Sequence, residues 1–234
     1  MPNRLLISPA ELGRANTGLR LNKYVDRENP EFALIAQRKV DSAYEMAFRR
    51  WEAYWRKREE ECVLCKGRVI TRMIVGLGDE NVTENGIRLS TTYGTPIIPG
   101  SSVKGVLRAR ISDTDGRLRD FLFGGEDGDG DAGYASLQDA WWIPESQSAF
   151  KVDVLTPHHT GYYSGDGNRP PSELDSPTPV PFLTVRGSFL FVAEFLSDDP
   201  DGQWKRFFRD LMVGALERDG VGAKRSSGYG RFQF

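Results

Sequence analysis

The order of apolar segments constrains the fold of this chain more than any other feature of its sequence. Residues 68–77 form a β-branched apolar run, and residues 102–111 then show helical spacing. The pattern recurs as a long apolar run at 181–196 followed by helical spacing over about 202–218. With short strand-like segments between and after them, the order is βαββαβ. The sequence therefore predicts an α+β, ferredoxin-like (RRM-like) domain with a split-βαβ arrangement.

Shorter segments complete this order. Residues 86–93 alternate in polarity and predict a hairpin partner for the first strand, and residues 133–143 and 150–155 predict further strands. Residues 112–132 contain an acidic run and predict a loop. A glycine-rich segment that begins at Gly220 leads into a terminal strand.

A helix is predicted before this domain, over about residues 30–60. Asn29 can cap a helix, Pro30 suits its first position, and aromatic residues then recur with helical spacing opposite a basic face. We therefore divide the chain into an N-terminal arm and helical extension, residues 1–66, and the ferredoxin-like domain, residues 67–234.

Proline interrupts the domain at about residues 156–181, where six prolines occur without an apolar period. Such a stretch predicts an extended insertion without a core of its own. It contains both histidines of the chain, His158 and His159, and also Tyr162 and Tyr163.

Composition excludes several classes of protein. The chain has 234 residues, 39% of them hydrophobic, which is enough to bury a core. It has no apolar run near the roughly 20 residues of a membrane span, and its start lacks the apolar region of a signal peptide. Two cysteines do not make a disulfide framework. We expect a cytoplasmic protein without membrane contact.

The placement of charge is more informative than its sum. A net charge of −2 argues weakly against a nucleic-acid binder, but 23 of the 31 basic residues are Arg, which suits phosphate contacts. Acidic residues gather at 126–131 and 198–201, whereas segments 97–112 and 220–234 contain none. The two acid-free segments are the candidate sites.

The C-terminal segment is the stronger candidate. Glycines let backbone N–H groups approach an anion closely, a basic pair adds charge, and serine hydroxyls donate to phosphate oxygens. Tyr229 could stack on a base. The alternative is an unordered glycine turn before an edge strand. The candidate contacts are Gly222, Lys224, Arg225, Ser226, Ser227, Tyr229 and Arg231.

The second candidate surrounds the start of the helix at 102–111. We expect Ser101 or Ser102 to cap this helix, so that its first free N–H groups bind an anion. Lys104 and Arg108 lie four residues apart on one face. The alternative is an ordinary capped helix with a solvated basic face. A serine acyl-enzyme motif also fits Ser101 and Lys104, but its companion motifs are missing.

Metal binding is not expected. Cys62 and Cys65 form a single CxxC pair, whereas a structural zinc site needs four ligands. The acidic run 126–131 lacks the glycine and glutamate of a calcium loop, since Ala132 and Gln138 stand at those positions. We predict unpaired thiols, a solvated acidic loop and no cofactor.

These motifs resemble the RAMP superfamily of CRISPR proteins. The resemblance rests on PIIPGSSVKGVLRARI at 96–111 and GAKRSSGYGRF at 222–232. Between them, KVDVLTPHH at 151–159 and PFLTV at 181–185 resemble the sixth-subunit family of the type III-B Cmr effector complex. The likeness runs from about residue 30 to the end of the chain.

The resemblance implies a non-catalytic backbone subunit of an antiviral ribonucleoprotein. Such a subunit binds CRISPR RNA near its 3′ end, stands beside other RAMP subunits and presses an extended segment on the guide–target RNA duplex. His158, His159, Tyr162 and Tyr163 are the candidate contacts of that segment.

Two other functions stay open. RAMP proteins that process precursor CRISPR RNA often use a histidine as general acid or base, so His158 or His159 could serve an endoribonuclease. Against this, the pair lies within the motif that resembles the backbone subunit, and we assign no catalytic residue. The other function is a scaffold whose basic faces meet acidic protein neighbours.

Overall fold

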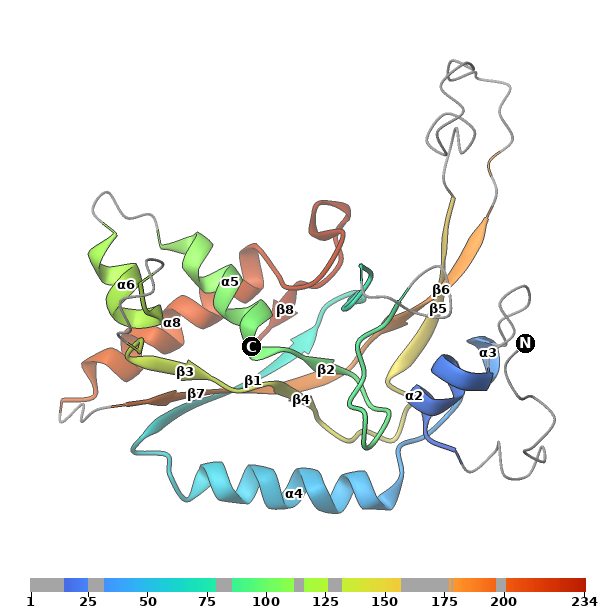
Figure 1. Ribbon diagram of the computed structural model, residues 1–234, viewed down its shortest axis with the longest axis horizontal. Helices are drawn as coiled ribbons and strands as arrows, with labels where there is room; N and C mark the ends of the chain where they lie inside the picture. Colours follow the sequence, from blue (N-terminus) through green and yellow to red (C-terminus); the bar gives the residue numbers. More distant parts are fainter. Residues whose placement is uncertain are drawn as a thin grey trace.

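An antiparallel sheet runs through the centre of the computed structural model (Figure 1). Its strand order is β2-β4-β7-β1-β8, and β3 also pairs with β7. These strands are β1 (Cys62–Val69), β2 (Ile97–Ile98), β3 (Ala135–Leu137), β4 (Ala140–Trp142), β7 (Ser188–Phe195) and β8 (Phe232–Gln233). The structure describes residues 15–24, 32–78, 86–111, 116–125, 132–156, 177, 179–196 and 201–234.

The longest pairing of this sheet joins β1 and β7. Their antiparallel register runs from Cys62 opposite Glu194 to Arg68 opposite Ser188. Seven of the eight residues of β7 are buried. Such burial requires cover on both faces of the sheet.

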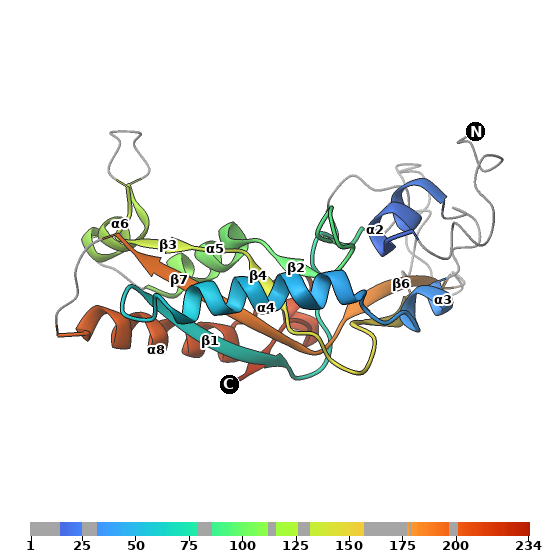
Figure 2. The same cartoon turned by 90° about the horizontal axis from the view of Figure 1, so that it is seen from below.

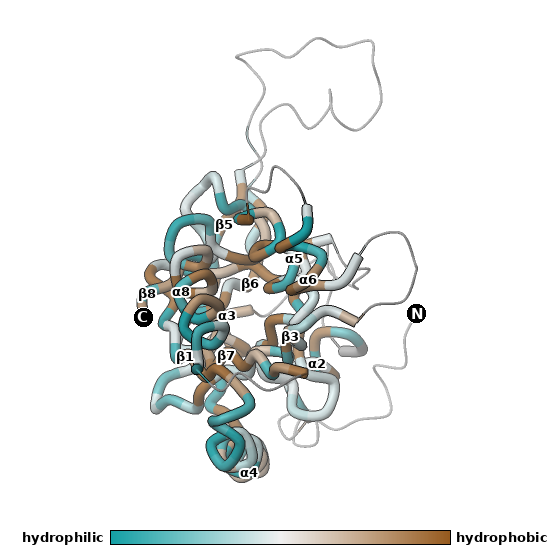
Figure 3. The backbone as a smooth tube through the Cα atoms, turned by 90° about the vertical axis from the view of Figure 1, so that its left-hand side faces the viewer, coloured by the Kyte–Doolittle hydropathy of each residue, from teal (hydrophilic) through white to brown (hydrophobic). Residues whose placement is uncertain are grey.

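Helices supply this cover (Figures 1 and 2). One side of the sheet carries α5 (Gly100–Arg110), α6 (Arg117–Phe123) and α8 (Gln203–Arg218), and α4 (Ser42–Arg56) lies on the other. Phe208 of α8 meets Phe195 of β7 edge-on, with ring centroids 5.6 Å apart. In Figure 3 hydrophobic segments lie among the strands and the helices α5, α6 and α8, while α4 is seen end-on below β1 and β7.

An aromatic face fixes α4 on its side of the sheet. The Trp51 ring stacks on the Trp141 ring of β4 at a centroid distance of 5.1 Å, and Tyr44 stacks on the same ring at 5.9 Å. The buried Tyr44 hydroxyl donates to the backbone carbonyl of Trp142. The aromatic face predicted from the helical spacing is thus the face that α4 buries.

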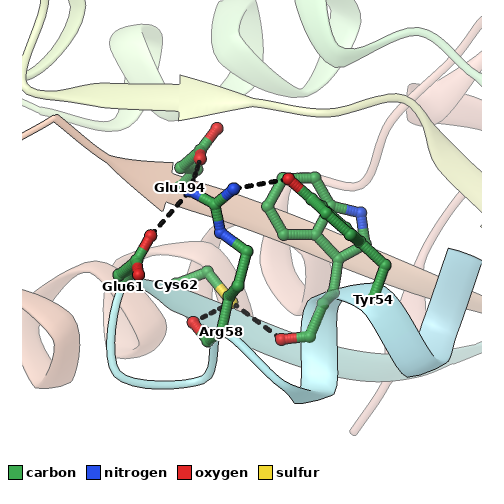
Figure 4. Close-up of polar contacts among 6 residues, drawn as sticks. Tyr54, Arg58, Glu61, Cys62 and Glu194 are labelled. Atoms are coloured by element: carbon green, nitrogen blue, oxygen red, sulfur yellow. Dashed lines mark hydrogen bonds and ion pairs between the residues drawn. The ribbon is translucent and has the colours of Figure 1, made fainter.

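Charged groups join the end of α4 to the sheet (Figure 4). Arg58 forms ion pairs with Glu61 at 2.6 Å and with Glu194 of β7 at 2.8 Å. The thiol of Cys62 donates to the backbone carbonyl of Arg58. Burial raises the pKa of this thiol to about 11. Cys62 and Cys65 are both free cysteines, as predicted, and both are buried, which the sequence did not indicate.

A separate two-stranded sheet projects from the domain (Figure 1). It is a hairpin of β5 (Phe150–Leu155) and β6 (Val180–Val185), paired from Phe150 opposite Val185 to Leu155 opposite Val180. The N-terminal helices are α2 (Thr17–Leu19), a π-helix (Arg20–Tyr24) and α3 (Phe32–Ala36). The last of these contacts the hairpin.

Several predicted elements are confirmed. The α+β class holds, and α5, α8, β5 and the terminal strand β8 lie where the sequence predicts them. The predicted strand 133–143 is present as β3 and β4, with a break at residues 138–139. Most of the predicted insertion at 156–181 lies outside the described residues.

The helix predicted over about 30–60 is wrong in its continuity. Two helices, α3 and α4, occupy this range, with a break at residues 37–41. The carboxylate of Asp41 accepts the backbone N–H of Ala43 at 3.0 Å and so caps a new helix. This side-chain bond competes with the backbone bonds of a continuous helix, so a new helix begins at Ser42.

The predicted strand 68–77 is displaced. β1 begins at Cys62 and ends at Val69, because buried residues alternate along the strand from Val63 to Val69, and Ile70 is 59% exposed. Beyond the turn, only Met73 forms a bridge, with Val185. The predicted hairpin strand 86–93 is also wrong, since only Leu89 forms a bridge and a turn follows.

Two further predictions are corrected. The segment 112–132, predicted as a loop, contains the helix α6. The long strand predicted at 181–196 is divided into β6 and β7 by a bend at Gly187, whose φ is +100°. This left-handed conformation suits glycine and turns the chain out of the hairpin into the central sheet.

We expect Tyr44→Phe to destabilise the protein. The substitution leaves the buried Trp142 carbonyl without its donor, which should lower the free energy of unfolding by about 1–2 kcal/mol in a denaturant titration. Tyr54→Phe is the control, because it also removes a hydrogen-bonded hydroxyl, here an acceptor from Arg58, but from a side chain that is 49% exposed. Equal losses in both variants would contradict the role given to the Tyr44 hydroxyl.

Candidate nucleic-acid interface

Backbone hydrogen bonds hold the glycine-rich loop at residues 220–230 in place. The N–H of Ala223 donates to the backbone carbonyl of Ile74 at 2.8 Å, and the N–H of Gly230 donates to the backbone carbonyl of Arg72 at 2.8 Å. A third bond runs within the loop, from Val221 N–H to the Gly230 carbonyl at 2.9 Å. The loop is therefore fastened to the chain that follows β1 and is not an unordered turn.

Glycine is needed in this loop where the two segments touch. Gly222 has a φ of +98°, and a Cβ there would lie 2.3 Å from the carbonyl oxygen of Ile74. Lys224 is the one non-glycine residue with positive φ in the described part of the chain, at +54°. The backbone of Lys224 is therefore strained, two residues from the glycine that packs against Ile74.

The predicted contact side chains of this loop mostly face solvent. Lys224, Arg225, Ser226, Ser227 and Arg231 are exposed, and Tyr229 is half-buried. Three of them form the short 3₁₀ turn Arg225–Ser227. A fastened backbone that presents exposed cations and hydroxyls suits an anionic ligand.

A cleft of about 460 Å³ lies between this loop and α5. Ser102 and Gly105 of α5 line one side, and Gly222 and Arg225 line the other. Residues 75–78 form a further wall. The two acid-free segments, far apart in sequence, therefore meet at one site.

Most of the cleft lining is small. Gly76, Gly105, Ala109 and Ala223 leave little side chain between an occupant and the backbone. Residues 75–78 were not predicted to line a site, although Gly76 and Gly78, which follow an apolar run, are the signal that could have indicated it.

The predicted cap of α5 is wrong. Pro99 holds the N-cap position without a side-chain bond, and Ser101 and Ser102 lie inside the first turn. The carboxylate of Asp139 accepts the N–H of Gly100 at 2.8 Å. An acid from the break between β3 and β4 therefore already occupies part of the predicted anion site at this N-terminus.

Lys104 and Arg108 do not line the cleft. Arg108 donates to the carbonyl of Gly124 at 3.0 Å, just beyond the end of α6. Lys104 lies one turn earlier on the same face and is half-buried. The structure thus separates these two predicted contacts from Ser102 and Arg225.

Tyr229 belongs to a polar cluster on the other side of the loop. Its hydroxyl donates to Asp153 of β5 at 2.9 Å, and Arg72 pairs with the same carboxylate oxygen at 2.6 Å. Burial opposes ionisation of Asp153, but hydrogen bonds from Tyr229, the Val154 N–H and Arg72 outweigh it and lower its pKa. Burial and the bond to Asp153 raise the pKa of Tyr229.

Other predicted groups stay outside this geometry. His158, His159, Tyr162, Tyr163 and the acidic run 126–131 lie outside the described residues. Within the described residues, no three His, Cys, Asp or Glu side chains come close enough to hold a metal ion. None of the helices described is both long and apolar enough to cross a bilayer.

Two named relatives match this chain, one of them over nearly its whole length. The Cmr subunit Cmr6 of Pyrococcus furiosus is 29% identical, over 98% of this chain and 87% of its own length. The Cmr6 subunit of Saccharolobus solfataricus is 28% identical over 70% of this chain, which spans 54% of that protein.

The fold is also found in a solved complex. A chain in the cryo-EM structure of the type III-B Cmr-beta complex bound to cognate target RNA matches 96% of this chain and 78% of its own, with a TM-score of 0.67 and 24% identity. The family model for the RAMP superfamily matches residues 66–233. Because this match spans the central sheet, α5, α8 and the glycine-rich loop, the chain belongs to the RAMP superfamily.

Proposed function

We propose that this protein is a non-catalytic, RNA-binding backbone subunit of a type III-B Cmr complex, placed near the 3′ end of the CRISPR RNA. The near full-length likeness to the Cmr6 subunit of Pyrococcus furiosus supports membership of such a complex. The observation that carries RNA binding is the cleft in which Ser102, Gly222 and Arg225 meet.

The chemistry of the cleft fits a phosphodiester backbone. The guanidinium of Arg225 can take a phosphate in two-pronged geometry, and the Ser102 hydroxyl can donate to it. Glycine on both walls allows a close backbone approach. None of these contacts reads a base, so binding is independent of guide sequence, as a subunit that serves many guides requires.

The ferredoxin-like architecture belongs to the same proposal. The central strands β8, β1, β7 and β4 follow the order of a split-βαβ sheet, with α5 and α8 as its two crossover helices. RRM domains of related topology stack RNA bases on their open sheet face. Here α4 covers that face with Trp51 on Trp141. We infer that RNA uses the cleft instead.

Further parts of the proposal follow from the relatives. The partners are CRISPR RNA, target RNA and other RAMP subunits in the cytoplasm. The hairpin β5–β6 bounds residues 156–179, which hold the proposed guide–target contacts. Lys104 and Arg108 remain proposed contacts of a second RNA-facing surface beside α6.

Arg225→Ala should weaken RNA binding and its salt dependence. Losing one phosphate contact should lower the slope of log affinity against log salt by about 0.7 for single-stranded RNA. Filter binding at several salt concentrations measures this. Arg50→Ala is the matched control, because Arg50 is exposed and lies on α4, across the sheet from α5 and the cleft. Identical slopes in both variants would contradict the assignment.

Gly105→Glu should weaken RNA binding without destabilising the fold. A Cβ at Gly105 meets no atom within 4 Å, so this wall of the cleft has space for a side chain, and a carboxylate there should repel phosphate. Gly105→Ala should keep RNA affinity and stabilise the helix by about 0.5–1 kcal/mol. Gly214→Glu on α8 is the charge control, since that site is equally open. The assignment is wrong if Gly214→Glu weakens binding as much.

The endoribonuclease alternative has a direct test. Purified protein incubated with repeat RNA should leave it intact on a denaturing gel, because we assign no catalytic group. Specific cleavage that is lost in His158→Ala would instead establish the ribonuclease. The scaffold alternative predicts that no nucleic acid copurifies with the isolated subunit.

A further inference from the structure

The carboxylate of Asp153 joins three segments that are distant in sequence. Tyr229 comes from the glycine-rich loop, Arg72 from the chain after β1, and Asp153 from β5 of the hairpin. Arg72 also donates to the Val152 carbonyl at 3.3 Å. The Thr71 hydroxyl donates to Gly228 at 2.9 Å, which ties the loop to the same segment.

This cluster lies above the base of the hairpin. At the base, Met73 and Val185 exchange two backbone hydrogen bonds of 2.8 Å. Asp153 stands further out, opposite Phe182 in the β5–β6 register. The Tyr229 ring lies 6.5 Å from the Phe182 ring, so the loop contacts both strands of the hairpin.

The contacts of the cluster are better suited to fixing the direction of the hairpin than to stabilising the fold. The Arg72 and Asp153 side chains are 37% and 25% exposed, and ion pairs that water reaches contribute little to folding. A carboxylate that accepts both a guanidinium and a phenol is nevertheless strongly directional. A pocket of about 290 Å³ is lined by Arg72, Asp153 and Tyr229 themselves, so the cluster borders open space on one side.

We propose that Asp153 is a positioning residue that holds the β5–β6 hairpin at a fixed angle to the RNA-binding loop through Arg72 and Tyr229. The inference rests on the proposed function, because the loop is the RNA contact and the hairpin bounds the guide–target segment. RNA seated on the loop then fixes the hairpin, and a displaced hairpin loosens the loop.

Spin labels on the full-length protein test the position of the hairpin without RNA. Thr156→Cys and Glu217→Cys place labels on the exposed end of the hairpin and on exposed α8. The native Cys62 and Cys65 should label slowly, because both are buried and burial raises the pKa of each to about 11. Asp153→Asn and Tyr229→Phe should broaden or shift the label-to-label distance distribution, while Tm changes by less than about 2 °C.

Asp210→Asn, at an exposed carboxylate of α8, and Tyr93→Phe are the controls and should keep the original distribution. An unchanged distribution in both cluster variants would overturn the proposal. Equal broadening in Asp210→Asn, or a fall in Tm of many degrees in the cluster variants, would do the same, because it would mean general loosening.

CRISPR RNA added to the labelled proteins tests the coupling. It should narrow the distribution in the otherwise unsubstituted protein but not in Asp153→Asn, whose affinity should fall about three- to tenfold. Tyr229→Phe should then add little to Asp153→Asn, since both remove one contact. Equal narrowing in all proteins, or additive losses of affinity, would overturn the coupling. If the unsubstituted protein binds no RNA, the proposed function fails, and the distances without RNA alone decide the role of Asp153.

Discussion

The antiparallel pairing of β1 with β7 is the constraint on which the rest of the structure depends. It places a strand that is buried almost throughout at the centre of the sheet, and both of its faces then need apolar cover. On one side α5 and α8 provide that cover, and α4 provides it on the other (Figures 1 and 2). Arg58, just beyond the end of α4, reaches Glu194 of β7, so an ion pair also joins α4 to this strand pair (Figure 4).

This double cover determines where a ligand can bind. Trp51 and Trp141 are stacked over the sheet face, and the cleft lies instead beyond the end of β1, where residues 75–78 of the segment 70–78 line it. The glycine-rich loop is hydrogen-bonded to that segment and α5 stands beside it, which creates the cleft. The same segment carries Arg72, so the hairpin and the loop are joined where the cleft is built.

The candidate site could be predicted in part. Glycines, cations and hydroxyls in residues 220–231 indicated an anion-binding loop, and the loop is ordered with Arg225 at the cleft. The role of Ser101 and Ser102 as caps was predicted wrongly, because Asp139, which bonds the start of α5, follows it by dozens of residues in sequence. No local pattern indicates that Asp153 and Tyr229 touch, since that contact depends on how the hairpin leaves the sheet.

The sequence by itself determined the α+β class, the order of its main strands and helices, the buried face of α4 and the two acid-free segments. These properties follow from local periodicity and residue chemistry, which a single chain displays directly. Only the tertiary structure decided where β1 starts, that Gly187 splits a long apolar run between two sheets, and that Ser102 faces Arg225 while Arg108 does not. The physical reason is that strand register, bends and helix rotation are set by contacts between segments far apart in the chain.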